Sequence, residues 1–221
     1  MKFLPCLLLL LFVSCGPSDA KTPQKKRNGN PESIQFFEVY ALKEISAEWQ
    51  EACKYSAKTD PSAKGEVSLD EIGFRGLRNL IRISDNTGAI CYVNENDRFA
   101  VDSILAIPEI AKLFPKDLQF MWALHPHTSD RPAFYELFAV KMPPNKKARI
   151  DGRHIQESVP QKDKNTGIMV IQLTMTQEGA SEWERMTSEN LNRFIAITTN
   201  NKVLSCPKVM MAITGGKTEI S

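Results

Sequence analysis

Motifs of enzyme active sites are missing from this sequence of 221 residues. It contains no G-x-S-x-G nucleophile elbow, no paired cysteine and histidine in a recognisable setting, and no acidic pair suited to proton transfer. The segment 215–218 (GGKT) resembles the end of a phosphate-binding loop, but Met211 stands where that loop requires its first glycine. We therefore expect a protein that is not an enzyme, has no catalytic residues and binds no cofactor.

Cysteine is scarce, and its spacing argues against both a zinc site and a disulfide framework. Outside the N-terminal region the chain holds only Cys53, Cys91 and Cys206, an odd number without a C-x-x-C spacing. We expect three buried thiols that behave as small hydrophobic groups, with one disulfide and one free thiol as the alternative. The histidines of segment 125–127 (HPH) and His154 have no evident carboxylate partner, so no metal site is expected.

Charge of one sign is not in large excess either. The chain has 28 basic and 26 acidic residues, a formal net charge of +2, and part of the excess lies in the run 25–27 (KKR). This imbalance is too small to indicate nucleic acid as a partner, and the short basic run is typical of a linker.

Long hydrophobic runs are limited to one, at residues 3–13, which follows the positively charged Lys2. A helix needs about 20 residues to cross a bilayer, so this run is too short to span one, but it suits the core of a signal peptide. No later segment approaches membrane-spanning length. We therefore expect any membrane attachment to come from the N-terminal region.

The apolar run leads into residues 12–16 (FVSCG), which resemble a lipobox. In a lipobox a small residue precedes a cysteine that receives diacylglycerol before cleavage; here that cysteine is Cys15, and Phe12 stands where leucine is usual. Cleavage after Ala20 without lipidation is the alternative. We expect a lipoprotein signal peptide at residues 1–14 and a lipid on Cys15 as the only membrane anchor.

After a polar tether at residues 15–33, the chain alternates strand patterns with amphipathic helix patterns. These patterns predict an α+β protein in which mixed or antiparallel sheets pack against amphipathic helices. Strands are expected at residues 36–42, 81–84, 89–93, 118–124, 134–142, 169–175, 194–198, 203–205 and 212–221, and helices at residues 42–57, 68–80, 104–114 and 178–193.

The helix expected at residues 178–193 has the clearest buried face, and Trp183 is its largest apolar side chain. Gly179 is expected to let this helix start close against the preceding strand. The side chains expected on the buried face are Ala180, Trp183, Met186, Thr187, Leu191 and Phe194.

An internal echo links residues 37–43 (FEVYALK) with residues 135–141 (YELFAVK). Duplication, which would give two related α+β subdomains, and convergent strand composition both explain it. We divide the folded chain into an N-terminal α+β subdomain at residues 34–100 and a second region at residues 101–221, whose head lies at residues 150–221.

Four segments of the C-terminal half together resemble the first large periplasmic domain of SecD and SecDF proteins. They are residues 172–180 (QLTMTQEGA), 186–187 (MT), 190–197 (NLNRFIAI) and 213–221 (ITGGKTEIS). Glu-Gly-Ala at the start of a helix, combined with Ile-Thr-Gly-Gly after a hairpin, is more specific than any single piece. A looser likeness extends the resemblance over residues 101–221. SecD is a membrane subunit that assists protein export after the translocon.

The sequence also departs from this family. Asn192 stands where the family commonly has glycine, and Cys206 stands where it commonly has alanine. The family continues into transmembrane helices with proton-coupling groups, whereas this sequence ends at Ser221. We therefore expect a module without proton coupling of its own.

The resemblance, taken together with the lipobox-like segment, leads us to expect a lipid-anchored binding module of the cell envelope that engages an exported, unfolded polypeptide or an envelope protein. It would face the periplasm or the cell surface, with the outer membrane favoured. We expect the last strand to have an open edge, unless the N-terminal half covers it. The alternative is a structural lipoprotein subunit of an envelope or surface assembly that reuses the fold. The expected partner-binding residues are Asn200, Asn201, Thr214, Gly215 and Gly216.

Overall fold

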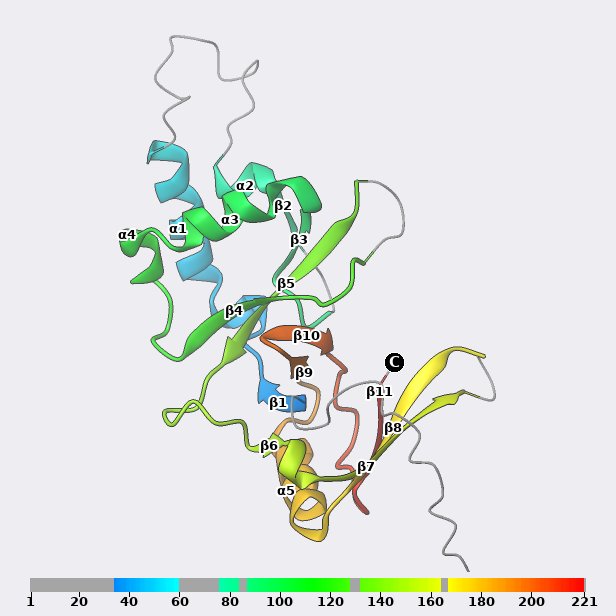
Figure 1. Cartoon of the computed structure of the whole chain (residues 1–221). Coiled ribbons are helices and arrows are strands. Elements are labelled where there is room, and N and C mark those ends of the chain that lie inside the picture. The colour runs from blue at the N-terminus through cyan, green and yellow to red at the C-terminus, as the bar shows by residue number, and fades with distance from the viewer. Residues whose placement is uncertain (1–33, 60–75, 84–86, 128–131, 164–166, 221) are drawn as a thin grey trace, which may run out of the picture.

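The computed structural model describes residues 34–59, 76–83, 87–127, 132–163 and 167–220, drawn in colour in Figure 1. The expected signal peptide and tether, Cys15, and the helix start expected near Ser68 lie outside these residues. The described strands pair antiparallel in three sheets that pack with helices, which confirms the predicted α+β class.

Sheet B, in the upper part of Figure 1, carries helices on one face. Its strands, in spatial order, are β2 (Ile81–Ile83), β3 (Cys91–Asn94), β5 (Phe134–Lys141) and β4 (Leu118–Trp122). The helices are α1 (Ser46–Thr59), α2 (Leu77–Leu80), α3 (Arg98–Leu105) and α4 (Pro108–Ala111), with the 3-10 turns η2 (Leu42–Glu44) and η4 (Glu95–Asp97). Sheet B takes two strands from each side of the division expected after residue 100.

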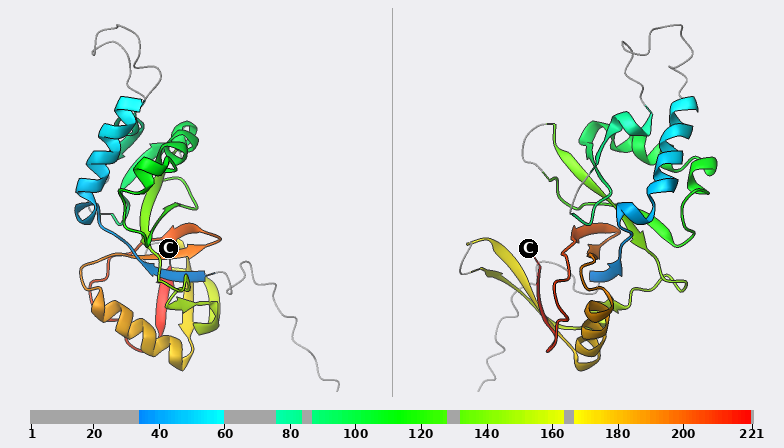
Figure 2. Two further views of the ribbon diagram at one scale, coloured as in Figure 1. Left: turned by 90° about the vertical axis from the view of Figure 1, so that its left-hand side faces the viewer. Right: turned by 180° about the vertical axis from the view of Figure 1, so that it is seen from behind.

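Sheet A lies in the middle of the molecule, between sheet B and helix α5 (Figure 2). Its strands, in spatial order, are β10 (Lys202–Ser205), β9 (Ile195–Thr199), β1 (Ile34–Glu38) and β6 (Ile150–Asp151). Side chains alternate along β1, so Phe36 enters one cluster of buried residues and Phe37 enters another on the opposite face. Because both faces are buried, β1 is apolar at consecutive positions.

Sheet C forms the lower part of the molecule and holds the last described strand (Figure 1). Its strands are β11 (Lys217–Ile220), β8 (Met169–Met175) and β7 (Ile155–Lys162). The turn η5 (Gly152–His154) joins β6 to β7, and α5 (Gln177–Glu189) follows β8. The Thr176 hydroxyl caps α5 by accepting from the Gly179 N–H at 3.1 Å.

Trp183 of α5 is the largest fully buried side chain of the described residues and packs on sheet A. Its ring centroid lies 5.1 Å from that of Phe36, in an edge-to-face arrangement. Ile197 of β9 and Leu173 of β8 belong to the same cluster, so this core joins α5 to sheets A and C. The predicted burial of Trp183 is confirmed.

Arg149 reinforces the contact between α5 and sheet A. Its Nε donates to Glu182 at 2.7 Å, and its Nη1 donates to Glu189 at 2.6 Å and to Glu38 of β1 at 3.3 Å. Burial alone would raise the pKa of Glu182, but hydrogen bonds from Arg149 and Arg185 hold that pKa below its usual value. The lowered pKa means that this network stabilises the fold at neutral pH and loses that contribution as acid protonates Glu182.

Two expected helices differ from those observed. The helix expected at 104–114 is two short helices, because α3 ends at Leu105 and Pro108, which lacks an N–H, begins α4 at its first turn. The helix expected to reach Arg193 ends at Glu189, and Asn192 has a positive φ of 61° that a helix does not allow.

Two side chains expected on the buried face of α5 lie elsewhere. Leu191 follows the end of α5 and is 48% exposed, so its predicted burial is wrong. Phe194 packs against the cluster between sheets A and B, where Phe37 and Phe138 lie, and not against the Trp183 cluster. Both differences follow from the early end of the helix, which takes the chain out of the 3.6-residue period.

Cys53, Cys91 and Cys206 are free thiols. Within the described ranges, no three or more His, Cys, Asp or Glu side chains lie close enough to one another to hold a metal ion. In the same residues, no helix has both the length and the apolar character needed to cross a membrane.

Replacing Trp183 by alanine is expected to lower the free energy of unfolding by about 3–5 kcal/mol, because the change leaves a large cavity against Phe36. Leu191→Ala is the matched control and is expected to cost less than about 1 kcal/mol, since Leu191 is half exposed. Urea unfolding followed by circular dichroism measures both values. Equal losses for the two variants would contradict this description of the core.

Candidate functional site

Strand β11 forms one edge of sheet C and pairs with β8 along its length. The Met175 N–H donates to the Gly216 carbonyl at 2.8 Å, so the alternation of an antiparallel pair directs the backbone groups of Lys217 and Glu219 away from β8. Both of these side chains are exposed, whereas Ile220 is buried. Among the described residues no strand pairs with this outer side of β11, which we call the β11 edge.

The turn before β11 is held tightly against α5. Gly215 and Gly216 have positive φ values of 77° and 65°, which glycine adopts without strain. A Cβ on Gly216 would lie 2.6 Å from the Cβ of Ala180, whereas a Cβ on Gly215 would meet no atom within 4 Å. The Ile213 N–H donates to the Thr187 hydroxyl of α5 at 2.9 Å. These contacts fix the point from which β11 starts.

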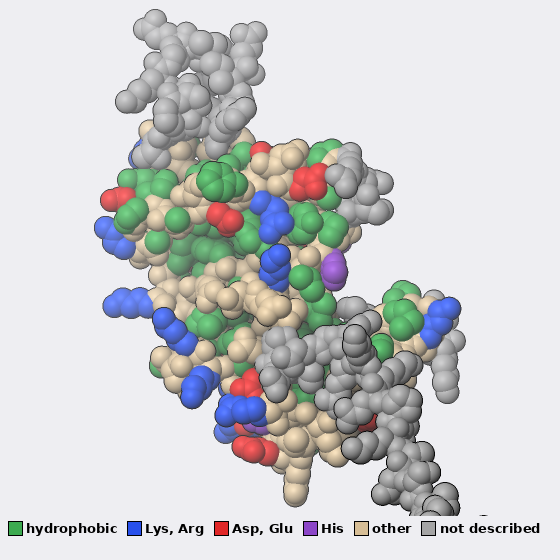
Figure 3. Space-filling model, viewed as in Figure 1, with side chains coloured by type: hydrophobic (Ala, Val, Ile, Leu, Met, Phe, Trp, Pro, Cys, Tyr) green, Lys and Arg blue, Asp and Glu red, His purple; other side chains and the backbone are tan. Residues whose placement is uncertain are grey.

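Several apolar side chains are exposed in the segment that leads into β11 and at the start of its neighbour β8. Met210 and Met211, in the segment before the turn, are each 70% exposed, and Met169 at the start of β8 is 60% exposed. Ile168 is also exposed, and Figure 3 shows hydrophobic side chains at the far end of the β7–β8 hairpin. Methionine is flexible and polarisable, so such a surface adapts to varied apolar partners.

A groove of about 730 Å3 runs between α1 and β2, the edge strand of sheet B. Trp49 and Cys53 line it from α1, and Ile81 and Ile83 line it from β2. Two basic residues also line it, Lys54 from α1 and Arg78 from α2. This groove is a second place where a sheet edge lies beside apolar side chains.

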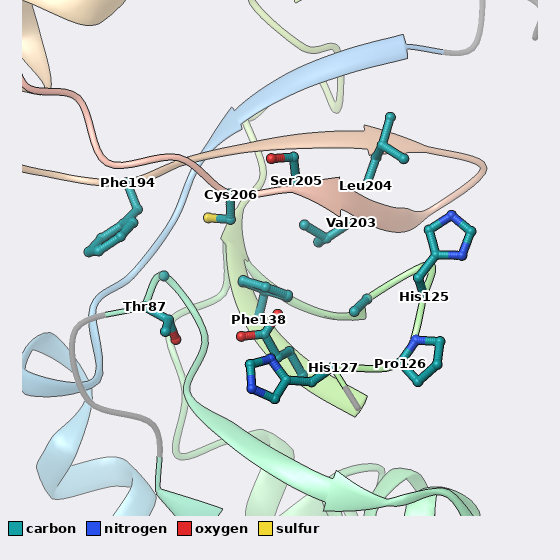
Figure 4. A pocket seen from close by; sticks show the side chains of 13 residues that line it. Thr87, His125, Pro126, His127, Phe138, Phe194, Val203, Leu204, Ser205 and Cys206 are labelled. Atoms are coloured by element: carbon teal, nitrogen blue, oxygen red, sulfur yellow. The ribbon is translucent and has the colours of Figure 1, made fainter. Parts of the chain in front are cut away.

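A pocket of about 470 Å3 lies between sheets A and B (Figure 4). Its walls come from β5 with Glu136 and Phe138, from the loop after β4 with His125 and His127, and from Cys206 after β10. The backbone of this region is tied together, since the Leu124 N–H donates to the Val203 carbonyl at 2.7 Å and the Ala123 N–H to the Glu136 carbonyl at 2.9 Å.

The pocket places several titratable groups together. Burial raises the pKa of Glu136, while His127 and a hydrogen bond from Tyr92 act in the opposite direction. Tyr92 lies opposite Glu136 in the β3–β5 ladder, and its ring centroid is 4.6 Å from that of His127. Burial also raises the pKa of the Cys206 thiol, so this thiol is protonated and a poor nucleophile at neutral pH.

Residues 137–221 match the family model described as SecDF, P1 head subdomain. This segment resembles the SecDF head. SecD of Rhodothermus marinus, a protein translocase subunit, is 30% identical over 128 residues, which cover 57% of this chain and 20% of that protein. SecD of Acidaminococcus fermentans is 33% identical over 72 residues, which cover 33% of this chain and 17% of that protein. The chain thus spans about a fifth of the length of these curated relatives.

A solved structure of SecDF, described as a membrane component that enhances protein export, covers 85% of this chain and 85% of its own. Its sequence identity is 14% and its TM-score is 0.33. The family model and the SecD relatives, rather than this structural likeness, confirm the resemblance predicted from the C-terminal segments. We call residues 137–221 the SecD-like head.

The expected partner-binding residues fall in two parts of the SecD-like head. Asn200 and Asn201 form the exposed β9–β10 turn with φ values of 50° and 58°, as predicted for asparagine in such a turn. Thr214 and Gly215 are exposed just before β11, whereas Gly216 is buried. The first pair belongs to sheet A and the second group leads into sheet C.

Gly179 allows a close approach to η5, and not to the preceding strand as predicted. A Cβ at this position would lie 2.4 Å from the His154 carbonyl oxygen. His154 is held beside α5 by Asp151, with 3.2 Å between Nδ1 and Oδ1. His154 therefore lies apart from His125 and His127, which line the pocket, and the three histidines are not brought together.

The pocket was not predicted from the sequence, where the histidines of segment 125–127 have no evident carboxylate partner. The available signal was Glu136, a carboxylate within the otherwise uncharged segment 134–140 (FYELFAV). Inward and outward side chains alternate along any half-buried strand, which by itself explains one polar residue such as Glu136. Glu136 therefore does not indicate a pocket unless the loop that packs over it is also known.

Gly215 and Gly216 provide a matched pair that tests the turn before β11. Either alanine substitution costs about 1–2 kcal/mol because φ is positive, and Gly216→Ala adds about 1–3 kcal/mol because its Cβ collides with Ala180. Urea unfolding should therefore give Gly216→Ala a clearly lower free energy of unfolding than Gly215→Ala. Adding Ala180→Gly should recover part of the loss in Gly216→Ala; an unchanged loss would show that the collision with Ala180 is not its cause.

Proposed function

We propose that this protein is a cell-envelope module that binds an exported polypeptide in an extended conformation, as an added strand on β11. The observation that supports this function is the β11 edge of the SecD-like head, with which no described strand pairs. The outward N–H and C=O groups of Lys217 and Glu219 can pair with the backbone of any extended chain. Such pairing is largely independent of sequence, as a role in export requires.

The relatives support the biological setting of this proposal. The SecD proteins of Rhodothermus marinus and Acidaminococcus fermentans are named protein translocase subunits. Because this chain spans about a fifth of their length, we assign to it a binding step and not the activity of a whole translocase subunit.

The size of the edge implies weak, reversible binding. Two outward-facing residues offer up to about four backbone hydrogen bonds, each worth roughly 0.5–1.5 kcal/mol net, and ordering the bound chain offsets part of this. The exposed methionines Met210, Met211 and Met169 add apolar contacts that adapt to different side chains. Weak binding suits a module that must release its polypeptide.

Glu219→Pro is expected to weaken binding of an unfolded polypeptide about two- to tenfold, because proline removes one outward N–H of β11. Glu219→Ala is the matched control: it removes the same carboxylate, keeps the N–H and should bind like the wild type. Fluorescence anisotropy of a labelled, permanently unfolded polypeptide measures all three affinities. Equal affinities for Glu219→Pro and Glu219→Ala would refute strand addition at β11.

Hydrogen exchange locates the contact independently of any substitution. The Lys217 and Glu219 amides should exchange fast in the free protein and slow down when the unfolded polypeptide is added. Slow exchange in the free protein, or new protection confined to β2 beside the α1 groove, would contradict the assignment to β11. Protection of β11 by a folded envelope protein, with none from the unfolded polypeptide, would favour the structural-subunit alternative.

The proposal includes attachment to the membrane through a lipid on Cys15, supported by the lipobox-like segment 12–16. Cys15→Ala should move the protein from the membrane to the soluble fraction, because without acyl chains no other anchor is expected. Fractionation of cells after a salt wash, with mass spectrometry of the mature N-terminus, measures this. Wild-type membrane binding of Cys15→Ala would place the anchor elsewhere.

A further inference from the structure

We propose that the pocket between sheets A and B is a binding site for an organic cation, an alkylammonium or guanidinium group on a short apolar stem. The pocket is lined by residues that the β11 proposal does not use, and it lies between β5 and β10 (Figure 4). This inference does not depend on strand addition at β11.

The charge of the pocket selects a cation. Glu136 is the one carboxylate among the described residues that line it, and no lysine or arginine lines it. The Cys206 thiol is neutral because burial raises its pKa. Among the described lining residues, Glu136 is therefore the one acidic group, and the imidazoles of His125 and His127 are the only nitrogen bases.

The remaining walls suit the apolar stem of such a ligand. Phe138 and Phe194 contribute aromatic rings, and Val203 contributes an aliphatic side chain. Aromatic faces attract ammonium and guanidinium groups, and a volume of about 470 Å3 falls in the range of small-molecule sites.

The pocket is preformed by tight packing and backbone hydrogen bonds. A Cβ on Gly88 would lie 2.4 Å from Cys206 Sγ and 3.0 Å from Phe194 Cβ, so only glycine fits here without a shift of neighbouring atoms. The His127 N–H donates to the Phe134 carbonyl at 2.7 Å, which fixes the loop carrying that histidine. A preformed pocket loses little entropy when a ligand binds.

Glu136 is retained at a cost to stability. Burial raises its pKa in the folded state, so at neutral pH the fold is less stable than it would be with an uncharged group at this position. A half-buried carboxylate whose pKa is shifted by its surroundings is a feature of functional sites. A bound cation would offset the penalty directly.

Acid is expected to abolish binding, because protonation removes the charge of Glu136. The titratable groups that face this carboxylate are Tyr92 of β3, His127 after β4 and Cys206 after β10. Because the pKa of Glu136 is raised, binding is lost at a higher pH than an ordinary glutamate would give.

Nuclear magnetic resonance of the full 15N-labelled chain tests the proposal with n-butylammonium, and with n-butanol and butyrate as neutral and anionic analogues. The amine should give saturable shifts at the Gly88, Ala123 and Cys206 amides, with at least tenfold weaker binding of the alcohol and carboxylate. Glu136→Gln should weaken amine binding at least tenfold without loss of thermal stability. Glu157→Gln, exposed on β7, is the control and should bind as the wild type does.

Two short peptides distinguish the sources of the cation: one with a central lysine and one with norleucine in its place. Binding of the lysine peptide as tightly as n-butylammonium identifies side chains of a polypeptide as the ligand, and binding of the free amine alone identifies a small molecule. No saturable shift with the amine, or equal binding of the amine and the alcohol to the wild-type protein, overturns the proposal even if Glu136→Gln fails to fold.

Discussion

The pairing of β1 with β9 is the constraint on which the rest of the structure depends. Residues Ile34–Glu38 lie against Ile195–Thr199, so the first described strand is built into a sheet made from the C-terminal part of the chain. This pairing places Phe36 on Trp183 and Phe37 on the opposite face, and thereby joins the core below sheet A to the core above it. Closing so long a loop is entropically expensive, and the two buried faces together offset that cost.

Sheet A is buried on both faces, whereas sheets B and C each present edge strands away from it. β2 is one edge strand of sheet B and lines the groove beside α1, and β11 is one edge strand of sheet C. The Arg149 network holds α5 to β1 on the side of sheet A away from the pocket, so polar groups there are paired with one another. Glu136 differs, because its neighbours only partly offset the effect of burial on its pKa.

Helices and strands could be predicted from the sequence where apolar residues keep one regular spacing over the whole element. The strand at 169–175, the start of α5, the burial of Trp183 and the Asn200–Asn201 turn all follow from spacing and from residue preferences for φ. The break at Pro108 was missed because a proline in a first turn fits either one long helix or the start of a second. The β1–β9 pairing could not be predicted, since the composition of a strand does not show which other strand it pairs with.

The β11 edge is easier to predict from a sequence than the pocket between sheets A and B, and the difference has a physical cause. An edge that binds backbone needs only one strand that is unpaired on its outer side, as β11 is among the described residues, and glycines such as Gly215 and Gly216 mark its start. A pocket needs side chains from several segments at once, here β5, the loop after β4 and the end of β10. Each of those segments has an ordinary composition for its element. The chemistry of the pocket therefore arises from packing between sheets A and B, and only the fold can show it.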